Sequence, residues 1–302
     1  MGVLRTPDEY FEELDGFSFQ PHYLEVADED LGNLRIHYLD EGPADGPLVL
    51  CLHGEPTWCY LYRKMIPILT GAGCRVLAPD LVGFGRSDKP AERTDYSYRK
   101  HVRWMTDWMT SLNLRDITLL GQDWGGLIGL RLLAENPQRF ARFSLSNTGL
   151  PTGDHAVSEA FHRWRTFSQE DPGFDIGFIV NLFGRGDLSA AEMDAYRAPF
   201  PSDDYKAGAR QFPVLVPTEP DNAAAEDNRR AWQALMQWEN PALMCFSDAD
   251  PIMRGGEKPF LKLVPGTRGQ PHRTLHGRHF IQEEDGETWA RVVADWMSET
   301  QP

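Results

Sequence analysis

The feature that most constrains the fold is a short stretch in which a strand-like run, a glycine-flanked turn and a helical pattern follow one another. Residues 117–120 are mainly apolar and are bounded by a turn signal, as in a buried strand. They lead into Gly-Gln-Asp-Trp-Gly-Gly at positions 121–126, after which leucine and isoleucine recur with helical spacing. Glycines are needed here because a Cβ on either side of so tight a turn would clash. The stretch therefore predicts a strand and a helix joined by a sharp turn that presents Asp123.

The residue at the tip of this turn indicates the chemistry. The pattern is that of the nucleophile elbow of α/β-hydrolases, G-x-S-x-G, with Asp123 in place of the serine. A carboxylate is already anionic at neutral pH, and free N–H groups at the helix N-terminus favour its ionised form. Attack on a carbonyl would give a labile anhydride, whereas attack on a saturated carbon with a leaving group gives an ester. We therefore expect an alkyl substrate such as a haloalkane or an epoxide, the alternative being a helix-capping aspartate.

Composition restricts the possible partners and location. The length of 302 residues suits one large α/β domain or a core with an insertion. The net charge of −15 disfavours nucleic acid and anionic membranes as partners, since both require basic patches. The four cysteines form no C-x-x-C pair, and the N-terminus shows no hydrophobic signal region. We therefore expect free thiols, a cytoplasmic location, no membrane or nucleic-acid partner, and a monomer.

The order of the predicted elements indicates an α/β fold. Two antiparallel strands are expected at 22–26 and 34–39, and further strands at 47–52, 75–78, 117–120, 141–145, 243–246 and 273–275. Helices between them imply a mostly parallel, eight-stranded sheet flanked by helices. Between Pro151 and about Asn240 no buried strand occurs, and helical stretches are expected at 158–167, 176–182, 190–198 and 226–238. We therefore expect a core domain of residues 1–150 and 240–302 and an inserted helical cap domain, 151–239.

Functional residues in open α/β sheets collect at the carboxyl ends of the strands. Asp123, Asp250 and His279 follow predicted strands in the chain order nucleophile, acid, base. His279 would be the general base, the alternative being an ordinary structural histidine. Asp248 is a second candidate for the acid, but we favour Asp250 because it lies further into the loop and precedes a proline.

Three motifs together resemble the haloalkane dehalogenases of the α/β-hydrolase superfamily, from the region of residue 22 to the C-terminal helix. They are His-Gly-Glu-Pro-Thr at 53–57, Gln-Asp-Trp-Gly-Gly at 122–126 and His-Gly-Arg-His-Phe at 276–280. The resemblance implies the α/β-hydrolase fold and the hydrolysis of a carbon–halogen bond to alcohol, halide and proton. Substrate, water and halide ion would be the only small partners. No metal or organic cofactor is implied, because no cluster shows ligand spacing.

The branch that matches best places its acid after the seventh strand and binds halide with two tryptophans. These would be Trp124 and, in the first cap helix, Trp164. The other branch has an asparagine at the position of Glu55, and that asparagine donates to the halide. The side chain of Glu55 cannot take over this role. Indole N–H groups suit a leaving halide because they donate without attracting water. Trp232 and Trp238 are alternative donors in the same insertion.

The expected cycle has two steps. Asp123 displaces halide and forms an ester, and His279, oriented by Asp250, then activates the water that attacks it. The backbone N–H groups of Glu55 and Trp124 would form the oxyanion hole.

The main rival is an epoxide hydrolase, in which Tyr196 and Tyr205 of the cap would protonate the ring oxygen. Such enzymes usually carry histidine where this chain has Gln122. A fluoroacetate dehalogenase would carry arginine at position 124, and a non-catalytic receptor would not require the complete triad.

Overall fold

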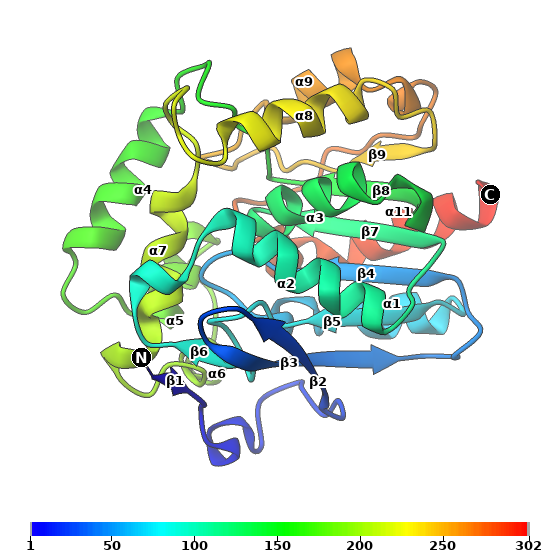
Figure 1. The fold of residues 1–302 in the computed structure, drawn as a ribbon. Helices are drawn as coiled ribbons and strands as arrows, with labels where there is room; N and C mark the ends of the chain where they lie inside the picture. Colours follow the sequence, from blue (N-terminus) through cyan, green and yellow to red (C-terminus); the bar gives the residue numbers. More distant parts are fainter. Residues whose placement is uncertain (1, 301–302) are drawn as a thin grey trace.

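A seven-stranded sheet forms the centre of the computed structural model, which describes residues 2–300 (Figure 1). The strand order is β2-β3-β5-β4-β7-β8-β9. The strands from β5 to β9 in this order are parallel, while β3 pairs antiparallel with both β2 and β5. A separate antiparallel pair is formed by β1 and β6. The strands are β1 Val3–Leu4, β2 His22–Asp28, β3 Gly32–Glu41, β4 Leu48–Leu52, β5 Arg75–Pro79, β6 Lys89–Pro90, β7 Ile117–Gln122, β8 Phe140–Ser146 and β9 Ala242–Met244.

Helices cover both faces of the sheet. In Figure 1, α2 and α3 lie in front of the sheet, and α1 and α11 lie behind it. The α-helices are α1 Ile66–Gly71, α2 Tyr98–Ser111, α3 Trp124–Glu135, α4 Glu159–Glu170, α5 Ile176–Phe183, α6 Ala190–Arg197, α7 Ala207–Leu215, α8 Ala225–Leu235, α9 Glu257–Leu263, α10 Ile281–Glu284 and α11 Gly286–Glu299. Short 3-10 helices include η2, Cys59–Tyr62, and η5, Asp203–Lys206. The predicted α/β-hydrolase fold class, a mostly parallel sheet between helices, is confirmed.

The predicted eighth strand is wrong. Residues 273–275 form only an isolated bridge, in which Leu275 pairs with Ser247. The backbone N–H of Arg273 donates to the Met244 carbonyl (3.0 Å), but the N–H of Met244 donates to the side-chain Nδ1 of His272 (3.1 Å). A side chain therefore replaces a backbone acceptor at the place where a regular ladder would begin. Pro271, which has no backbone N–H to donate, directly precedes His272.

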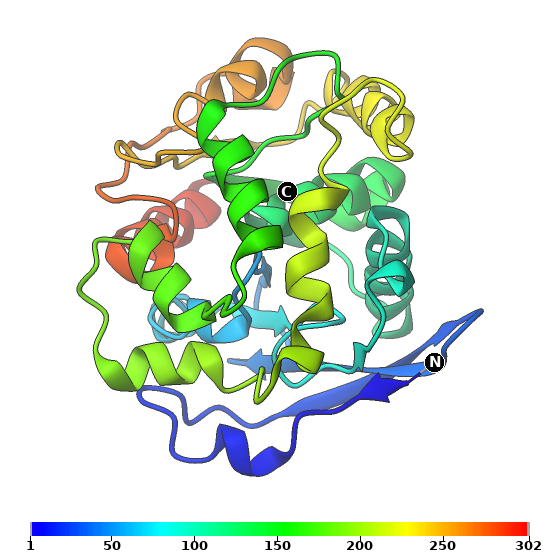
Figure 2. The same cartoon turned by 90° about the vertical axis from the view of Figure 1, so that its left-hand side faces the viewer.

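Five helices, α4 to α8, follow β8 and precede β9. Figure 2, turned so that the left side of Figure 1 faces the viewer, shows α4 and α7 crossing in front of the sheet. Four of the five were predicted with boundaries within three residues. The sequence patterns did not predict α7, which contains Pro213, or α9 of the core, which contains Pro259. A proline normally argues against a helix interior, but it is tolerated in a first turn, as in α9.

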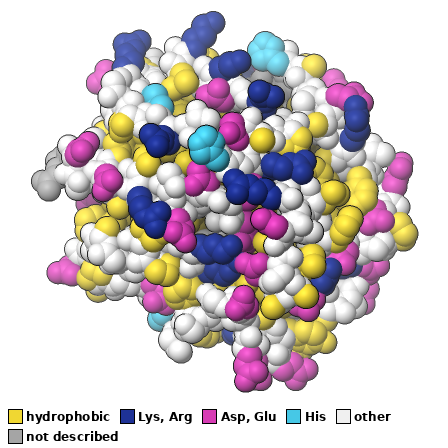
Figure 3. Space-filling view, turned by 180° about the vertical axis from the view of Figure 1, so that it is seen from behind, with side chains coloured by type: hydrophobic (Ala, Val, Ile, Leu, Met, Phe, Trp, Pro, Cys, Tyr) yellow, Lys and Arg dark blue, Asp and Glu magenta, His cyan; other side chains and the backbone are white. Residues whose placement is uncertain are grey.

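No helix between residues 2 and 300 is long and apolar enough to cross a membrane. The face seen in Figure 3 carries interspersed acidic and basic side chains, with hydrophobic ones in small groups between them. All four cysteines are buried and unpaired with one another.

Candidate active site

Asp123 occupies the sharp turn between β7 and α3. Its backbone has φ of +50° and ψ of −129°, a conformation that L-residues rarely adopt outside strained functional turns. The turn is possible because Gly125 has no side chain, since a Cβ there would lie 1.8 Å from the carbonyl oxygen of Leu52. Thr148 supports the turn by donating its hydroxyl to the Asp123 carbonyl (2.7 Å). The strand–turn–helix arrangement predicted from the glycines is confirmed.

The structure brings the three predicted triad residues together. His279 places Nδ1 2.8 Å from Oδ2 of Asp250 and Nε2 3.5 Å from Oδ2 of Asp123. Asp248 instead faces His276, whose Nδ1 lies 2.9 Å from its carboxylate. Both members of that second pair are exposed, whereas Asp250 and His279 are buried. Asp250 is therefore the carboxylate positioned to orient His279.

Electrostatics favour a charged pair of Asp250 and His279. Burial alone would lower the pKa of His279, but attraction to Asp250 and hydrogen bonding to Asp123 outweigh it, so the pKa is raised. Burial likewise opposes ionisation of Asp250, yet His279 and the backbone N–H groups of Ile252 and Met253 hold its pKa below the ordinary value. The two neighbouring aspartates thus favour the protonated form of His279.

Two backbone N–H groups lie next to the reacting position of Asp123, and one of them donates to its carboxylate. The N–H of Glu55 donates to Oδ1 of Asp123 (2.8 Å). The N–H of Trp124 lies at the first position of α3, where a helix offers it no internal acceptor. Burial and the charge of Asp123 raise the pKa of the Glu55 side chain well above its usual value, and its Oε1 has no partner among residues 2–300. Burial and Asp123 therefore favour the neutral form of the Glu55 side chain beside the nucleophile.

Two tryptophan rings border the same cavity as Asp123. Trp124 begins α3, and Trp164 comes from α4, where it packs against Phe174 and Phe183. Neither indole N–H has a hydrogen-bond acceptor within the described part of the chain. Trp232 also lines the cavity, but its N–H donates to the Leu150 carbonyl (2.8 Å).

The tyrosines that an epoxide hydrolase would need do not line the cavity. The Tyr196 hydroxyl donates to the carboxylate of Glu283, which is also paired with Arg63, and Arg63 binds Glu192 of α6 at 2.6 Å. This buried network joins α6 to the core, so Tyr196 is a structural residue. Neither Tyr196 nor Tyr205 lines the cavity, and no tyrosine within residues 2–300 does. Trp238, the last candidate halide donor, is also absent from its wall.

Two polar residues hold the loops of the site and were not predicted. Asn147, which follows β8, donates to the carbonyl groups of Arg278 (2.8 Å) and His279 (3.0 Å), and accepts from the N–H of Ser247 (3.1 Å). Gln122 at the end of β7 donates to the His279 carbonyl (3.1 Å). These residues therefore fix the backbone that carries the histidine. The available signal was a buried polar residue at the carboxyl end of a strand.

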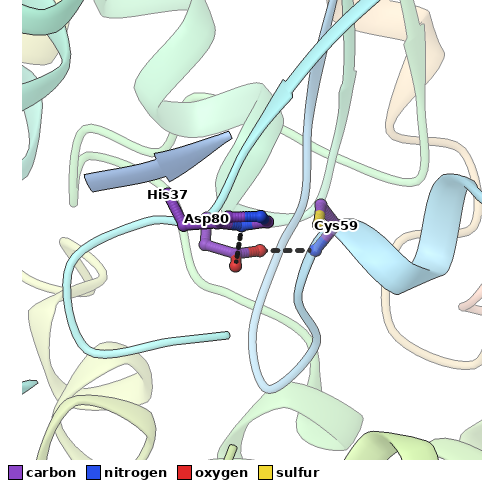
Figure 4. Close-up of side chains that lie close together, drawn as sticks. All are labelled: His37, Cys59 and Asp80. Carbon is purple, nitrogen blue, oxygen red and sulfur yellow. Dashed lines mark hydrogen bonds and ion pairs between the residues drawn. The ribbon is translucent and has the colours of Figure 1, made fainter. Parts of the chain in front are cut away.

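One group of three potential metal ligands lies apart from this site. Within residues 2–300, only His37, Cys59 and Asp80 come close enough together (Figure 4). Both oxygens of Asp80 are already engaged, by Nδ1 of His37 (2.7 Å), the N–H of Cys59 (2.8 Å) and the N–H of Arg86 (2.8 Å). Burial, reinforced by Asp80, raises the pKa of the Cys59 thiol well above its usual value, so it offers no thiolate. The group is therefore a hydrogen-bonded cluster that links β3 and η2 to the segment after β5.

The fold and the Asp-His-Asp arrangement define a hydrolase of the α/β-hydrolase class. A family profile described as "alpha/beta hydrolase fold" matches residues 47–286. Among similar proteins, the haloalkane dehalogenase of Psychrobacter cryohalolentis is 56% identical over 98% of both chains. That of Mycolicibacterium paratuberculosis is 51% identical over 98% of this chain and 99% of the other. The solved structure of haloalkane dehalogenase DpaA from Paraglaciecola agarilytica NO2, described as tetrameric, has a TM-score of 0.88 at 34% identity and covers 99% of this chain and 98% of that one. The chain belongs to the haloalkane dehalogenase family.

Proposed function

We propose that this protein hydrolyses the carbon–halogen bond of haloalkanes through an alkyl ester on Asp123. The observation that carries the proposal is the meeting of three groups at one apolar cavity: an elbow carboxylate, a histidine–aspartate pair and two indole N–H groups without acceptors in the described chain. The full-length similarity to haloalkane dehalogenases supports the same activity.

In the first step, an oxygen of Asp123 attacks the carbon that bears the halogen. The carbon–halogen bond breaks, its electron pair leaves with the halide, and a carbon–oxygen bond forms. The indole N–H groups of Trp124 and Trp164 receive the halide in surroundings that exclude water, where such donors are most effective. Burial and Asp123 raise the pKa of the Glu55 carboxyl group, which favours its neutral form and so limits its repulsion of the halide.

In the second step, His279 removes a proton from water, and the oxygen of that water attacks the ester carbonyl. Esterification has by then neutralised Asp123, which removes one of the two anions that raise the pKa of His279. The pKa of His279 therefore falls, which favours the neutral imidazole that can accept a proton from water. The N–H groups of Glu55 and Trp124 hold the oxyanion, which contributes a few kcal/mol, roughly 3 to 4 per donor. The bond between the carbonyl carbon and the alkyl oxygen then breaks, and the leaving oxygen takes the proton from His279. The alcohol departs, Asp123 is regenerated as it loses a proton, and the halide is released.

We further propose that residues 151–239 form a cap domain over the core of residues 1–150 and 240–302. The cap supplies Trp164 and slightly more than half of the residues that line the cavity. Four buried free thiols favour a reducing compartment, for which we propose the cytoplasm. We propose a monomer, to be tested by light scattering because the Paraglaciecola relative is described as tetrameric.

Halide release tested beside epoxide opening distinguishes this function from its rival. With 1-bromobutane we expect stoichiometric bromide and 1-butanol, and with 1,2-epoxybutane no diol above background. The reason is that the cavity wall within the described residues lacks a tyrosine to protonate the epoxide oxygen. Diol formation without bromide release would favour the epoxide hydrolase instead.

Trp164→Phe should weaken halide binding while keeping an aromatic ring in the cap. We expect bromide to quench the intrinsic fluorescence only at concentrations at least about tenfold higher, because a charge-assisted hydrogen bond of roughly 1.5 to 3 kcal/mol is lost. Trp232→Phe is the matched control, since the indole N–H of Trp232 is already bound to Leu150. If Trp232→Phe weakens quenching and Trp164→Phe does not, the two roles are exchanged.

A further inference from the structure

Arg278 directly precedes His279 in the chain, but its side chain points toward the helix α5 rather than lining the cavity. Its guanidinium donates to the carbonyl of Leu182 (3.2 Å), in the last turn of α5, and to the carbonyl of Gly184 (3.1 Å), which follows the helix. A cation is favoured at this end of a helix, because the carbonyl groups there point outward without helical partners. Arg278 therefore stabilises the C-terminus of α5.

The next residue, His279, caps the same helix with its backbone. The N–H of His279 donates to the carbonyl of Phe183, the last residue of α5 (3.2 Å). Basic side chains and backbone N–H groups are the usual partners of the last helix carbonyls, but they normally come from residues that follow the helix. Here two consecutive residues from the other end of the chain supply them, and one of the two is the proposed base.

The backbone of Arg278 is held firmly by three polar side chains. Its carbonyl accepts from the amide of Asn147 (2.8 Å) and from the hydroxyl of Ser247 (2.9 Å). Its N–H donates to the carboxylate of Glu284 (3.1 Å). Because both backbone groups are bound, the side chain extends toward α5 from a fixed point. The contact between the guanidinium and the helix therefore sets where α5 ends relative to the loop of the base.

The end of α5 also contacts the proposed halide donor of the cap. The side chain of Phe183 lines the cavity and packs edge-on against Trp164, with ring centroids 5.2 Å apart and an interplanar angle of 77°. Phe183 thus touches the base through its carbonyl and the halide donor through its ring. A displacement of this residue would move both groups, and small displacements of reacting groups reduce rates strongly.

Resting on the proposed dehalogenation at Asp123, we propose that Arg278 is a positioning residue that fixes the base and the cap halide donor relative to each other. Its guanidinium holds the end of α5, and the ring of Phe183 passes that position on to Trp164. The hydrogen bond from His279 to Phe183 joins the base to the same point. Halide stabilisation in the first step and activation of water in the second therefore both depend on this one contact.

The test is Arg278→Met, which keeps the length of the side chain and removes its donors. The bromide concentration that quenches half of the fluorescence should rise, and hydrolysis of the ester in a single turnover of 1-bromobutane should slow. We expect each to change by about twofold to thirtyfold, the range typical of residues that couple sites without touching a ligand. The imidazole NMR signals of His279 should shift as well. Arg278→Lys, whose ammonium can still donate to a helix carbonyl, should restore most of each property.

Arg210→Met is the matched control. The guanidinium of Arg210 donates to the carbonyls of Ser168 (3.0 Å) and Asp171 (2.9 Å) at the end of α4, the helix that carries Trp164. This variant therefore removes an equivalent arginine cap from the neighbouring cap helix without removing a bond to the loop of the base. It should leave the NMR signals of His279 and the rate of ester hydrolysis unchanged.

Two further variants test the path through Phe183. Phe183→Leu keeps the backbone bond from His279 and removes the ring beside Trp164, so it should weaken bromide binding. In a protein that already carries Trp164→Phe, Arg278→Met should weaken bromide binding no further, because its effect on the halide passes through that indole.

The outcomes separate this inference from the proposed function. If Arg278→Met leaves either bromide quenching or the His279 signals unchanged, if Arg210→Met changes those signals equally, or if Phe183→Leu binds bromide normally, the positioning role is overturned and the dehalogenase activity still stands. Absence of bromide release by the unaltered protein would refute the proposed function. Quenching and NMR, which require no turnover, would still decide the role of Arg278.

Discussion

His279→Ala is expected to release one equivalent of bromide per active site and then to stop. The first step needs no base, because Asp123 attacks as a carboxylate and halide leaves without a proton. In the proposed second step His279 deprotonates water, so the ester should accumulate without it. Stopped-flow measurement of bromide should show a burst of unit amplitude with a steady-state rate reduced by at least about a thousandfold. Mass spectrometry should find the added alkyl group on the peptide that contains Asp123.

Two further variants make this result specific. Asp250 is buried, and removing its partner leaves an unpaired charge, which destabilises a fold. His279→Gln retains a donor toward Asp250 and should also trap the ester. His276→Ala, three residues earlier in the same motif, removes an exposed histidine that pairs only with Asp248 among the described residues, and it should turn over normally. Repeated turnover by both His279 variants would be incompatible with its role as the base.

Asp123→Ala is expected to abolish both steps, with halide release below about one ten-thousandth of the original rate. Without this carboxylate no ester can form, so the burst must disappear together with the turnover. Halide binding should persist, because the indole groups of Trp124 and Trp164 remain. Removing one carboxylate should also lower the pKa of His279, which histidine NMR can follow, because Asp123 is one of the two groups that raise it.

Retained bromide quenching is the control that Asp123→Ala still folds and keeps its site. Asp248→Ala is the matched substitution of a nearby carboxylate, since Asp248 lies two residues before Asp250 yet faces His276. It should leave turnover close to normal. Measurable dehalogenation by Asp123→Ala, with mass analysis excluding residual unmodified protein, would show that another group carries the nucleophilic role.

Local patterns in the sequence predict which residues of the candidate site lie close together. The glycines around Asp123 specify the elbow because a Cβ on Gly125 would collide with the backbone of β4. Chain order places His279 after the last segment of the sheet, and Trp164 was assigned from a resemblance. The choice of Asp250 over Asp248 rested on loop position, and the structure places Asp250 2.8 Å from His279.

The positioning residues could not be predicted because their partners are distant in the sequence. Asn147 holds a loop 132 residues away, and Gln122 holds the same loop from another strand. Only the folded sheet brings their amides to the carbonyl of His279. The same reason applies to the incomplete eighth strand, where the side chain of His272 replaces a backbone acceptor. Helices α7 and α9 were missed because their prolines argue against a helix when neighbouring contacts are unknown.

The most direct test of the covalent mechanism is hydrolysis in water enriched in oxygen-18, with enzyme in excess over 1-bromobutane so that each site turns over once. If Asp123 forms the ester and water attacks its carbonyl carbon, the alcohol carries the original carboxylate oxygen and the label enters the protein at Asp123. We predict unlabelled 1-butanol and a gain of one heavy oxygen on the peptide containing Asp123. Labelled alcohol with unlabelled protein would mean that water attacks the substrate directly, which would contradict the ester mechanism.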